Sequence, residues 1–176
     1  NYDYIFTVGY HHDIELKKLF QLNNKKLPTL IQHGSEKLDE ILLSNYESKI
    51  NNKILSKVII GLSWGEGSLS EDIEFISVLI SKLVEMNLVV VLRPHSMTLK
   101  RIPDYFDKIS LRLNTEKLKG ILFDKNSNQK DAIINSDFLV TDWSGLSFEY
   151  AFGYNRPILF IDSKPKLRNK NWIDLN

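Results

Sequence analysis

The sequence predicts an α/β protein built on a doubly wound parallel sheet. From residue 57 onward, short apolar runs alternate with stretches of helical periodicity. Each short run is apolar throughout rather than at every second position. Continuous apolar strands separated by helices are typical of a parallel sheet that helices cover on both faces.

The composition is that of an ordinary globular protein. The chain has 176 residues, of which 43% are hydrophobic and 26% charged, and its net charge is +1. This balance, with no basic aromatic stripe, argues against nucleic-acid binding. The chain has no cysteine, which excludes disulfides and thiolate chemistry and favours a cytoplasmic protein. No apolar run approaches the roughly 20 residues that a membrane span needs.

Parts of two domains are expected. Residues 1–56 should hold strands at 4–9 and 30–31, helices at 13–21 and 38–43, and a polar joint at 45–57. Residues 57–176 should form the sheet domain. Its expected strands lie at 58–62, 88–92, 121–123, 138–141 and 158–161, and its expected helices at 70–86, 103–113, 130–135 and 144–152. The chain begins without Met and stops without a helix cap, so we expect a piece of a longer protein whose sheet domain is incomplete at its C-terminal end.

Ligands of doubly wound sheets bind beyond the carboxyl ends of the strands, so the residues just after each strand are the candidates for a site. The loop at 63–68 has two glycines, which let backbone amides approach a ligand, and Ser68 with Glu71 fits a capping box. The alternative is a plain glycine-rich turn. The second loop follows the strand at 88–92, and its residues Arg93 and His95 can hold a phosphate. The alternative is a surface turn with Arg93 in a salt bridge and His95 solvated.

The third loop follows the strand at 138–141. Thr141 and Asp142 end this strand, and Ser144 and Gly145 open a helix whose start suits an anion. Glu149 lies one turn further on and can accept the hydroxyls of a ribose. The alternative is that Ser144 only caps the helix and Glu149 faces solvent. Because all three loops fall on one edge of one sheet, together they predict a nucleotide diphosphate site.

Several of these motifs resemble those of the CDP-glycerol glycerophosphotransferases, which build teichoic-acid-type polyol phosphate polymers of the cell envelope or capsule. The matching segments are 93–95, 136–145, 148–151 and 156–158, and residues 2–39 are similar to the stretch that leads from the first lobe of these enzymes into the second. The resemblance implies the two-lobed GT-B architecture. Residues 1–56 would then end the acceptor lobe and link the lobes, and residues 57–176 would form the nucleotide-binding C-terminal lobe.

The resemblance also implies an enzyme that transfers glycerol phosphate from a CDP-activated donor to a polyol phosphate, glycan or lipid-linked acceptor. It makes His95 the catalytic residue, which contacts the pyrophosphate or helps CMP depart. The implied donor-binding residues are Arg93, His95, Thr141, Asp142, Ser144, Gly145 and Glu149. Neither a metal nor a cofactor beyond the CDP-activated donor is expected, because helix ends and side chains can offset the leaving-group charge. A cytoplasmic protein with peripheral contact at the inner membrane face is implied.

Some residues depart from the family pattern. Ser96 replaces a proline, and Trp143 and Gly145 replace Tyr and Ser. CDP-ribitol, another CDP-polyol or a nucleotide sugar would therefore also fit as donor. Two other classes stay open: a GT-B glycosyltransferase or sugar-nucleotide epimerase that uses a UDP-sugar, and a non-catalytic nucleotide-binding module. The retained His95, Ser144 and Glu149 argue against the module.

Two further expectations concern the acceptor side. The base that deprotonates the acceptor would lie in the missing lobe, so the chain alone should bind nucleotide weakly and catalyse nothing. A basic run near the C-terminus could face a polyanionic acceptor or lipid head groups, or be a solvated loop. It consists of Lys164, Lys166, Arg168 and Lys170.

Overall fold

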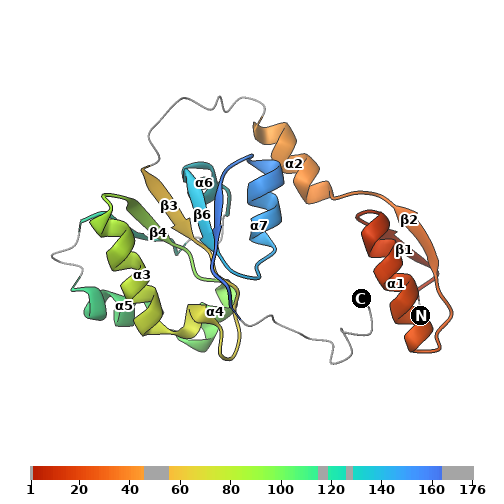
Figure 1. Ribbon diagram of the computed structural model, residues 1–176, viewed down its shortest axis with the longest axis horizontal. Helices are drawn as coiled ribbons and strands as arrows, with labels where there is room; N and C mark the ends of the chain where they lie inside the picture. The colour runs from red at the N-terminus through yellow and green to blue at the C-terminus, as the bar shows by residue number, and fades with distance from the viewer. Residues whose placement is uncertain (1, 46–55, 115–118, 126–128, 164–176) are drawn as a thin grey trace. The chain divides into compact units, whose positions relative to one another are not determined.

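A computed structural model describes residues 2–45, 56–114, 119–125 and 129–163 of the chain (Figure 1). These residues fall into two compact units, of which the first ends at Glu40 and the second begins at Ile41. The division comes before the joint expected at 45–57, most of which lies outside the described residues. It comes early because Ile41, only 5% exposed, packs in the core of the second unit.

The first unit is a small βαβ arrangement. Its strands β1 (Tyr4–Thr7) and β2 (Thr29–Gln32) pair in parallel, with α1 (Tyr10–Leu22) between them in the sequence. Helix α2 (Glu36–Asn45) follows and carries the chain into the second unit. These elements match the expected ones, although each helix is longer than its apolar periodicity suggested.

The second unit contains a five-stranded parallel sheet in the order β5-β4-β3-β6-β7. The strands are β3 (Lys57–Ile60), β4 (Val89–Leu92), β5 (Ile121–Phe123), β6 (Phe138–Thr141) and β7 (Ile158–Phe160). The helices are α3 (Ile73–Glu85), α4 (Ser96–Arg101), α5 (Tyr105–Leu113), α6 (Gln129–Ile134) and α7 (Leu146–Phe148). A 3₁₀ turn, η1 (Leu69–Glu71), precedes α3, and a π-helical turn, η2 (Glu149–Gly153), extends α7.

The three central strands are buried on both faces, which explains their continuous apolar runs. Successive residues of a strand point to opposite faces, and here they enter two separate cores. On β3, Val58 and Ile60 belong to the core that α3 and α5 cover, whereas Ile59 belongs to the core beneath α6 and η2. Val90 and Val91 of β4 divide between the two cores in the same way. Figure 1 shows the helices on the two sides of this sheet.

The start of α3 differs from its prediction. Ser68 and Glu71 do not form a capping box, because Leu69–Glu71 forms a separate 3₁₀ turn and the Ser68 side chain makes no capping bond. Asp72 caps α3 instead, its carboxylate accepting a hydrogen bond from Phe75 N–H at 2.9 Å. An aspartate at this position satisfies one of the unpaired amides of the first turn.

Candidate functional site

The three loops singled out in the sequence lie next to one another. Strands β4, β3 and β6 are neighbours in the sheet and run parallel, so their carboxyl ends share one edge. The loops that begin at Arg93, Gly61 and Asp142 therefore start side by side. Hydrogen bonds and ring contacts join them into one structure, as the following residues show.

Hydrogen bonds from two side chains, Thr141 and Asp142, join the end of β6 to the loop after β3. The Thr141 hydroxyl is fully buried and donates to the Gly61 carbonyl at 2.6 Å. The Asp142 carboxylate is 2% exposed and accepts from both Ser63 N–H and Ser63 Oγ–H, each at 2.7 Å. Both side chains therefore face a neighbouring loop of the protein. We interpret them as residues that position the site rather than as ligands of a donor.

His95 lies at the start of α4, a helix that the sequence analysis did not predict. Its Nδ1 accepts a hydrogen bond from Met97 N–H at 3.1 Å, so the ring caps this helix. The side chain is exposed, and its ring stacks on the indole of Trp64 with the ring centroids 5.6 Å apart and an interplanar angle of 24°. The stack connects the loop after β4 with the loop after β3.

Arg93 forms an ion pair with Asp124, the residue that directly follows β5. Both side chains are largely buried, with 13% and 9% of their surfaces exposed. The salt-bridge alternative for Arg93 is therefore the arrangement in the structure. Sequence reasoning missed Asp124, although it is the first polar residue after its strand, as Asp142 is after β6. That shared position is the signal that could have found it.

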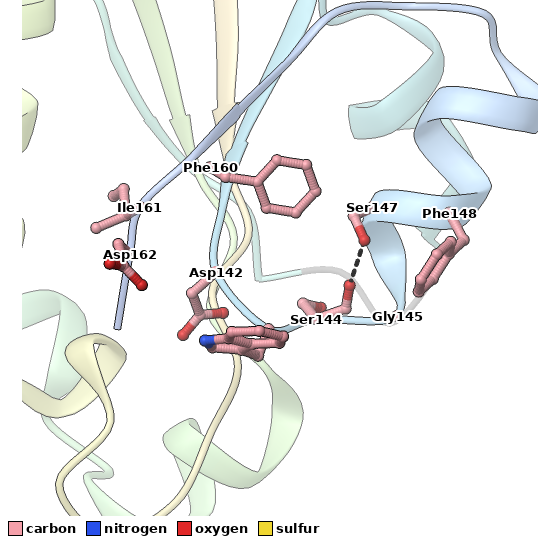
Figure 2. A pocket seen from close by; sticks show the side chains of 9 residues that line it. Asp142, Ser144, Gly145, Ser147, Phe148, Phe160, Ile161 and Asp162 are labelled. Carbon is pink, nitrogen blue, oxygen red and sulfur yellow. Dashed lines mark hydrogen bonds between the residues drawn. The ribbon is translucent and has the colours of Figure 1, made fainter. Parts of the chain in front are cut away.

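A cavity of about 500 Å³ opens beside the third loop (Figure 2). It is lined by Asp142, Trp143, Ser144, Gly145, Ser147, Phe148, Phe160, Ile161 and Asp162. In Figure 2 the segment from Asp142 to Gly145 runs along one side, and the end of β7 with Phe160 lies along another. Of the seven predicted site residues, three line this cavity, namely Asp142, Ser144 and Gly145. Arg93, His95, Thr141 and Glu149 are not part of its lining.

The turn into α7 is held by its own serines. The Ser144 carbonyl accepts from Ser147 N–H at 3.1 Å and from Ser147 Oγ–H at 2.8 Å, and the latter bond is drawn in Figure 2. Leu146 N–H points to Ser144 Oγ at 3.4 Å. Gly145 has ordinary helical backbone angles, and a Cβ added there would meet no atom within 4 Å. The backbone of Gly145 therefore borders open space beside the cavity.

Glu149 begins the π-helical turn η2, where the sequence predicted an uninterrupted helix over 144–152. The side chain is half-buried, and its carbonyl accepts a hydrogen bond from Tyr154 N–H at 3.3 Å. Single π-helical turns inside helices frequently occur at functional sites. Glu149 lies one helical turn beyond Gly145, as expected, and η2 continues the helix from there to Gly153.

The remaining candidate chemistry is sparse. Within residues 2–45, 56–114, 119–125 and 129–163, no group of three or more His, Cys, Asp or Glu side chains has the geometry of a metal site. No helix among these residues is both long and apolar enough to cross a membrane. The basic run at 164–170 lies outside the described residues.

Comparison with known proteins relates the chain to one family and to several solved structures, two of which follow. The family model of the CDP-glycerol:poly(glycerophosphate) glycerophosphotransferases matches residues 69–164, which is more than half of the chain. No curated protein matches the sequence. The UDP-GlcNAc 2-epimerase of Methanocaldococcus jannaschii, solved with UDP-GlcNAc and UDP, is similar with a TM-score of 0.59 and 13% identity, over 90% of this chain and 45% of that one. The wall teichoic acid polymerase TagF is similar with a TM-score of 0.46 and 19% identity, over 90% of this chain and 38% of that one.

The chain thus spans less than half the length of these two proteins. At this level of identity, the likeness to the epimerase concerns the fold alone. It confirms the predicted fold class, a doubly wound, Rossmann-like α/β sheet of the kind that forms the C-terminal lobe of GT-B enzymes.

Proposed function

Because the chain belongs to the CDP-glycerol:poly(glycerophosphate) glycerophosphotransferase family, we propose that it carries the donor-nucleotide site of an enzyme that transfers glycerol phosphate, or a related polyol phosphate, to a cell-surface polymer or lipid-linked acceptor. Residues 57–163 hold this site, and residues 1–40 belong to the end of the acceptor lobe. The whole enzyme works on the cytoplasmic side, with peripheral contact at the inner membrane face. The donor is CDP-activated, and no metal takes part in the transfer.

One observation carries the proposal within the structure: three loops meet at one edge of the sheet and are fastened to each other. Asp142 holds the loop of Ser63, and Trp64 of that loop stacks on His95. Ligands of doubly wound sheets bind at this edge. The third loop adds a cavity of about 500 Å³ that borders Ser144 and Gly145, which is large enough for part of a nucleotide-linked donor.

The proposed transfer makes and breaks one phosphorus–oxygen bond. The acceptor hydroxyl oxygen attacks the phosphorus that carries the glycerol, and the bond from that phosphorus to the CMP oxygen breaks. The hydroxyl proton passes to a base that lies outside the described residues. His95 donates to the phosphate oxygens, so that charge on the departing CMP is stabilised.

The other predicted residues receive roles that fit their contacts. Ser144 and Gly145 line the phosphate side of the cavity, and Glu149 accepts hydrogen bonds from the ribose hydroxyls. Arg93 supports the site through its ion pair with Asp124 rather than by touching the donor. Thr141 and Asp142 hold the loop after β3 in place.

Calorimetric titration of the chain with CDP and with UDP tests this function. We expect CDP to bind more tightly than UDP, and Glu149→Gln to weaken CDP binding by about tenfold because it removes charge-assisted hydrogen bonds. Glu85→Gln is the matched control. This glutamate of α3 is exposed, and within the described residues its ion pair is with Lys82, which is exposed as well. Turnover of CDP-glycerol by the chain alone is not expected.

The opposite outcomes are informative. A preference for UDP would contradict the CDP-polyol donor and favour the alternative class, a transferase or epimerase that uses a UDP-sugar. Failure of both nucleotides to bind would contradict a donor site carried by this chain alone. Equal loss of CDP affinity in Glu149→Gln and Glu85→Gln would contradict the ribose contact.

A further inference from the structure

His95 is held from two directions by groups of this chain. Its Nδ1 accepts the Met97 N–H bond at 3.1 Å, and the Trp64 indole lies against its face at a centroid distance of 5.6 Å. A neutral imidazole that accepts at Nδ1 carries its proton on Nε2. The hydrogen bond therefore selects one tautomer and limits rotation of the ring, and the stack fixes the plane in which Nε2–H lies.

Trp64 is in turn anchored through the residue before it. Ser63 donates two hydrogen bonds to the Asp142 carboxylate, one from its backbone N–H and one from its hydroxyl, each 2.7 Å long. Two charge-assisted bonds from one residue to one carboxylate fix both its position and its orientation. Because Asp142 is only 2% exposed, water competes little for these bonds. The backbone that carries the indole is thereby fixed to the end of β6.

The segment that continues this loop into η1 also contacts α4, the helix that His95 caps. Beyond Trp64, Ser70 Oγ lies 3.3 Å from Thr98 Oγ1 of α4, and both residues are buried. Glu71 pairs with Arg101 at the other end of α4, at 2.6 Å. The loop after β3 and helix α4 are therefore linked at three successive places, and the Trp64–His95 stack is the one that involves the imidazole.

We propose that Trp64 is a positioning residue for His95, and that Asp142 acts through Ser63 to set where Trp64 lies. This inference rests on the proposed function, in which Nε2–H of His95 is directed at the phosphates of the CDP-activated donor. Trp64 contributes to donor binding without touching the donor. Asp142 contributes from one step further away, by the chain of contacts Asp142, Ser63, Trp64 and His95.

The first test observes His95 without any ligand. Nuclear magnetic resonance of the imidazole nitrogens and ring protons should show the Nε2–H tautomer in the wild-type chain, with ring protons shifted by the indole ring current. Trp64→Leu should remove this shift and let the unstacked ring turn away from Met97 N–H, so that the bond which selects the tautomer weakens and both tautomers appear. Trp64→Phe should preserve most of the wild-type pattern. Asp142→Asn should change the His95 signals in the same direction as Trp64→Leu but less.

Two controls accompany this measurement. His95→Gln assigns the signals. Thermal unfolding of each variant shows whether it is folded. Unchanged His95 signals in a folded Trp64→Leu variant would overturn the proposal.

The second test is a double-mutant cycle on CDP binding. Trp64→Leu should weaken binding by roughly tenfold, and adding it to His95→Gln should cause no further loss, because Trp64 acts only through the imidazole. Independent, multiplying losses would mean that Trp64 touches the donor or acts through the fold, and would refute the positioning role. If the wild-type chain binds no CDP, the proposed function fails, while the ligand-free spectra still decide whether Trp64 positions His95.

Discussion

Arg93 and Asp142 are both charged, and each directly follows a central strand, but their side chains are turned toward other parts of the protein. Arg93 pairs with Asp124 after β5, and Asp142 binds Ser63 after β3. A partner for each could be expected from the cost of burying a charge. Which partner it would be depends on the order of strands in the sheet, which a single sequence does not state.

Two fully buried tyrosines provide a contrast at the scale of single residues. Tyr150 donates its hydroxyl hydrogen to the Ser136 carbonyl at 2.8 Å, whereas the Tyr105 hydroxyl contacts no hydrogen-bonding partner within the described part of the chain. Tyr150→Phe should therefore lower the free energy of unfolding by about 1 kcal/mol, because it also leaves a buried carbonyl with one bond fewer. Tyr105→Phe should change this free energy by no more than about 0.5 kcal/mol. Urea unfolding measures both, and equal losses would contradict the contrast.

The difference in stability between wild type and Tyr150→Phe should depend on pH in the alkaline range. Burial raises the pKa of Tyr150 to about 12, and the hydrogen bond and positive charge of Arg156 only partly offset this shift. An unfolded tyrosine has a pKa of about 10, so between these values the folded state keeps a proton that the unfolded state loses. Stability from this group is complete below pH 10 and falls as pH rises toward 12. The advantage of wild type over Tyr150→Phe should shrink across that window, and a constant difference would contradict it.

At the scale of elements, strand β6 is fastened to β3 at both ends. Asp137, just before β6, accepts from the backbone N–H groups of Ser56 and Lys57 at 2.9 and 2.8 Å. Asp142, just after β6, accepts from Ser63. The two aspartates thus hold the beginning and the end of the neighbouring strand. This explains why polar residues flank so apolar a segment, apart from any contact with a donor.

The residue directly after β3, Gly61, lies close to Leu146 at the start of α7. A Cβ added at Gly61 would lie 2.8 Å from Leu146 Cδ2 and 3.5 Å from Leu139 Cδ1. Gly61→Ala should therefore displace Leu146 at the start of α7 and lower the free energy of unfolding by about 1–2 kcal/mol. Thermal or urea unfolding measures the loss.

Two variants make this prediction specific. Gly145→Ala is the matched control, because a Cβ there meets nothing within 4 Å and no loss of stability is expected. Adding Leu146→Val to Gly61→Ala should recover part of the loss, since it removes the atom that the new Cβ approaches. A loss in Gly145→Ala as large as that in Gly61→Ala would show that glycine flexibility, rather than this contact, decides the result.

The elements that the sequence predicted well are those that are buried so completely that their residues must be apolar. Strands β3, β4 and β6 are covered on both faces, so almost every position must be apolar. Helix α4 was missed because its six residues form no apolar stripe and its start depends on a histidine cap. The π-helical turn at Glu149 has no periodic signal, and the cap of α3 moved to Asp72 because a 3₁₀ turn intervened.

At the scale of the molecule, the predicted domain plan and the two compact units place the boundary differently. The sequence placed the joint in a polar stretch because polarity is a good marker of loops. It gave no sign that Ile41, in a helix before that stretch, belongs to the core beneath α6 and η2. A single buried side chain before a polar segment is invisible to periodicity, since it looks like any apolar residue of an amphipathic helix.

Two shortened chains can decide where the second unit begins. A chain that starts at Ser35 keeps all of α2 and Ile41, whereas a chain that starts at Ser56 keeps β3 and both backbone bonds to Asp137 but loses Ile41. If the unit begins at Ile41, the chain starting at Ser56 should be less stable than the one starting at Ser35 by about 3 kcal/mol, the usual cost of removing a buried Ile side chain. Ile41→Ala in the chain starting at Ser35 should reproduce most of this loss, because it removes the same buried side chain while the helix backbone stays. Equal stability of the two shortened chains would instead place the start of the folded unit at β3, where the sequence put it.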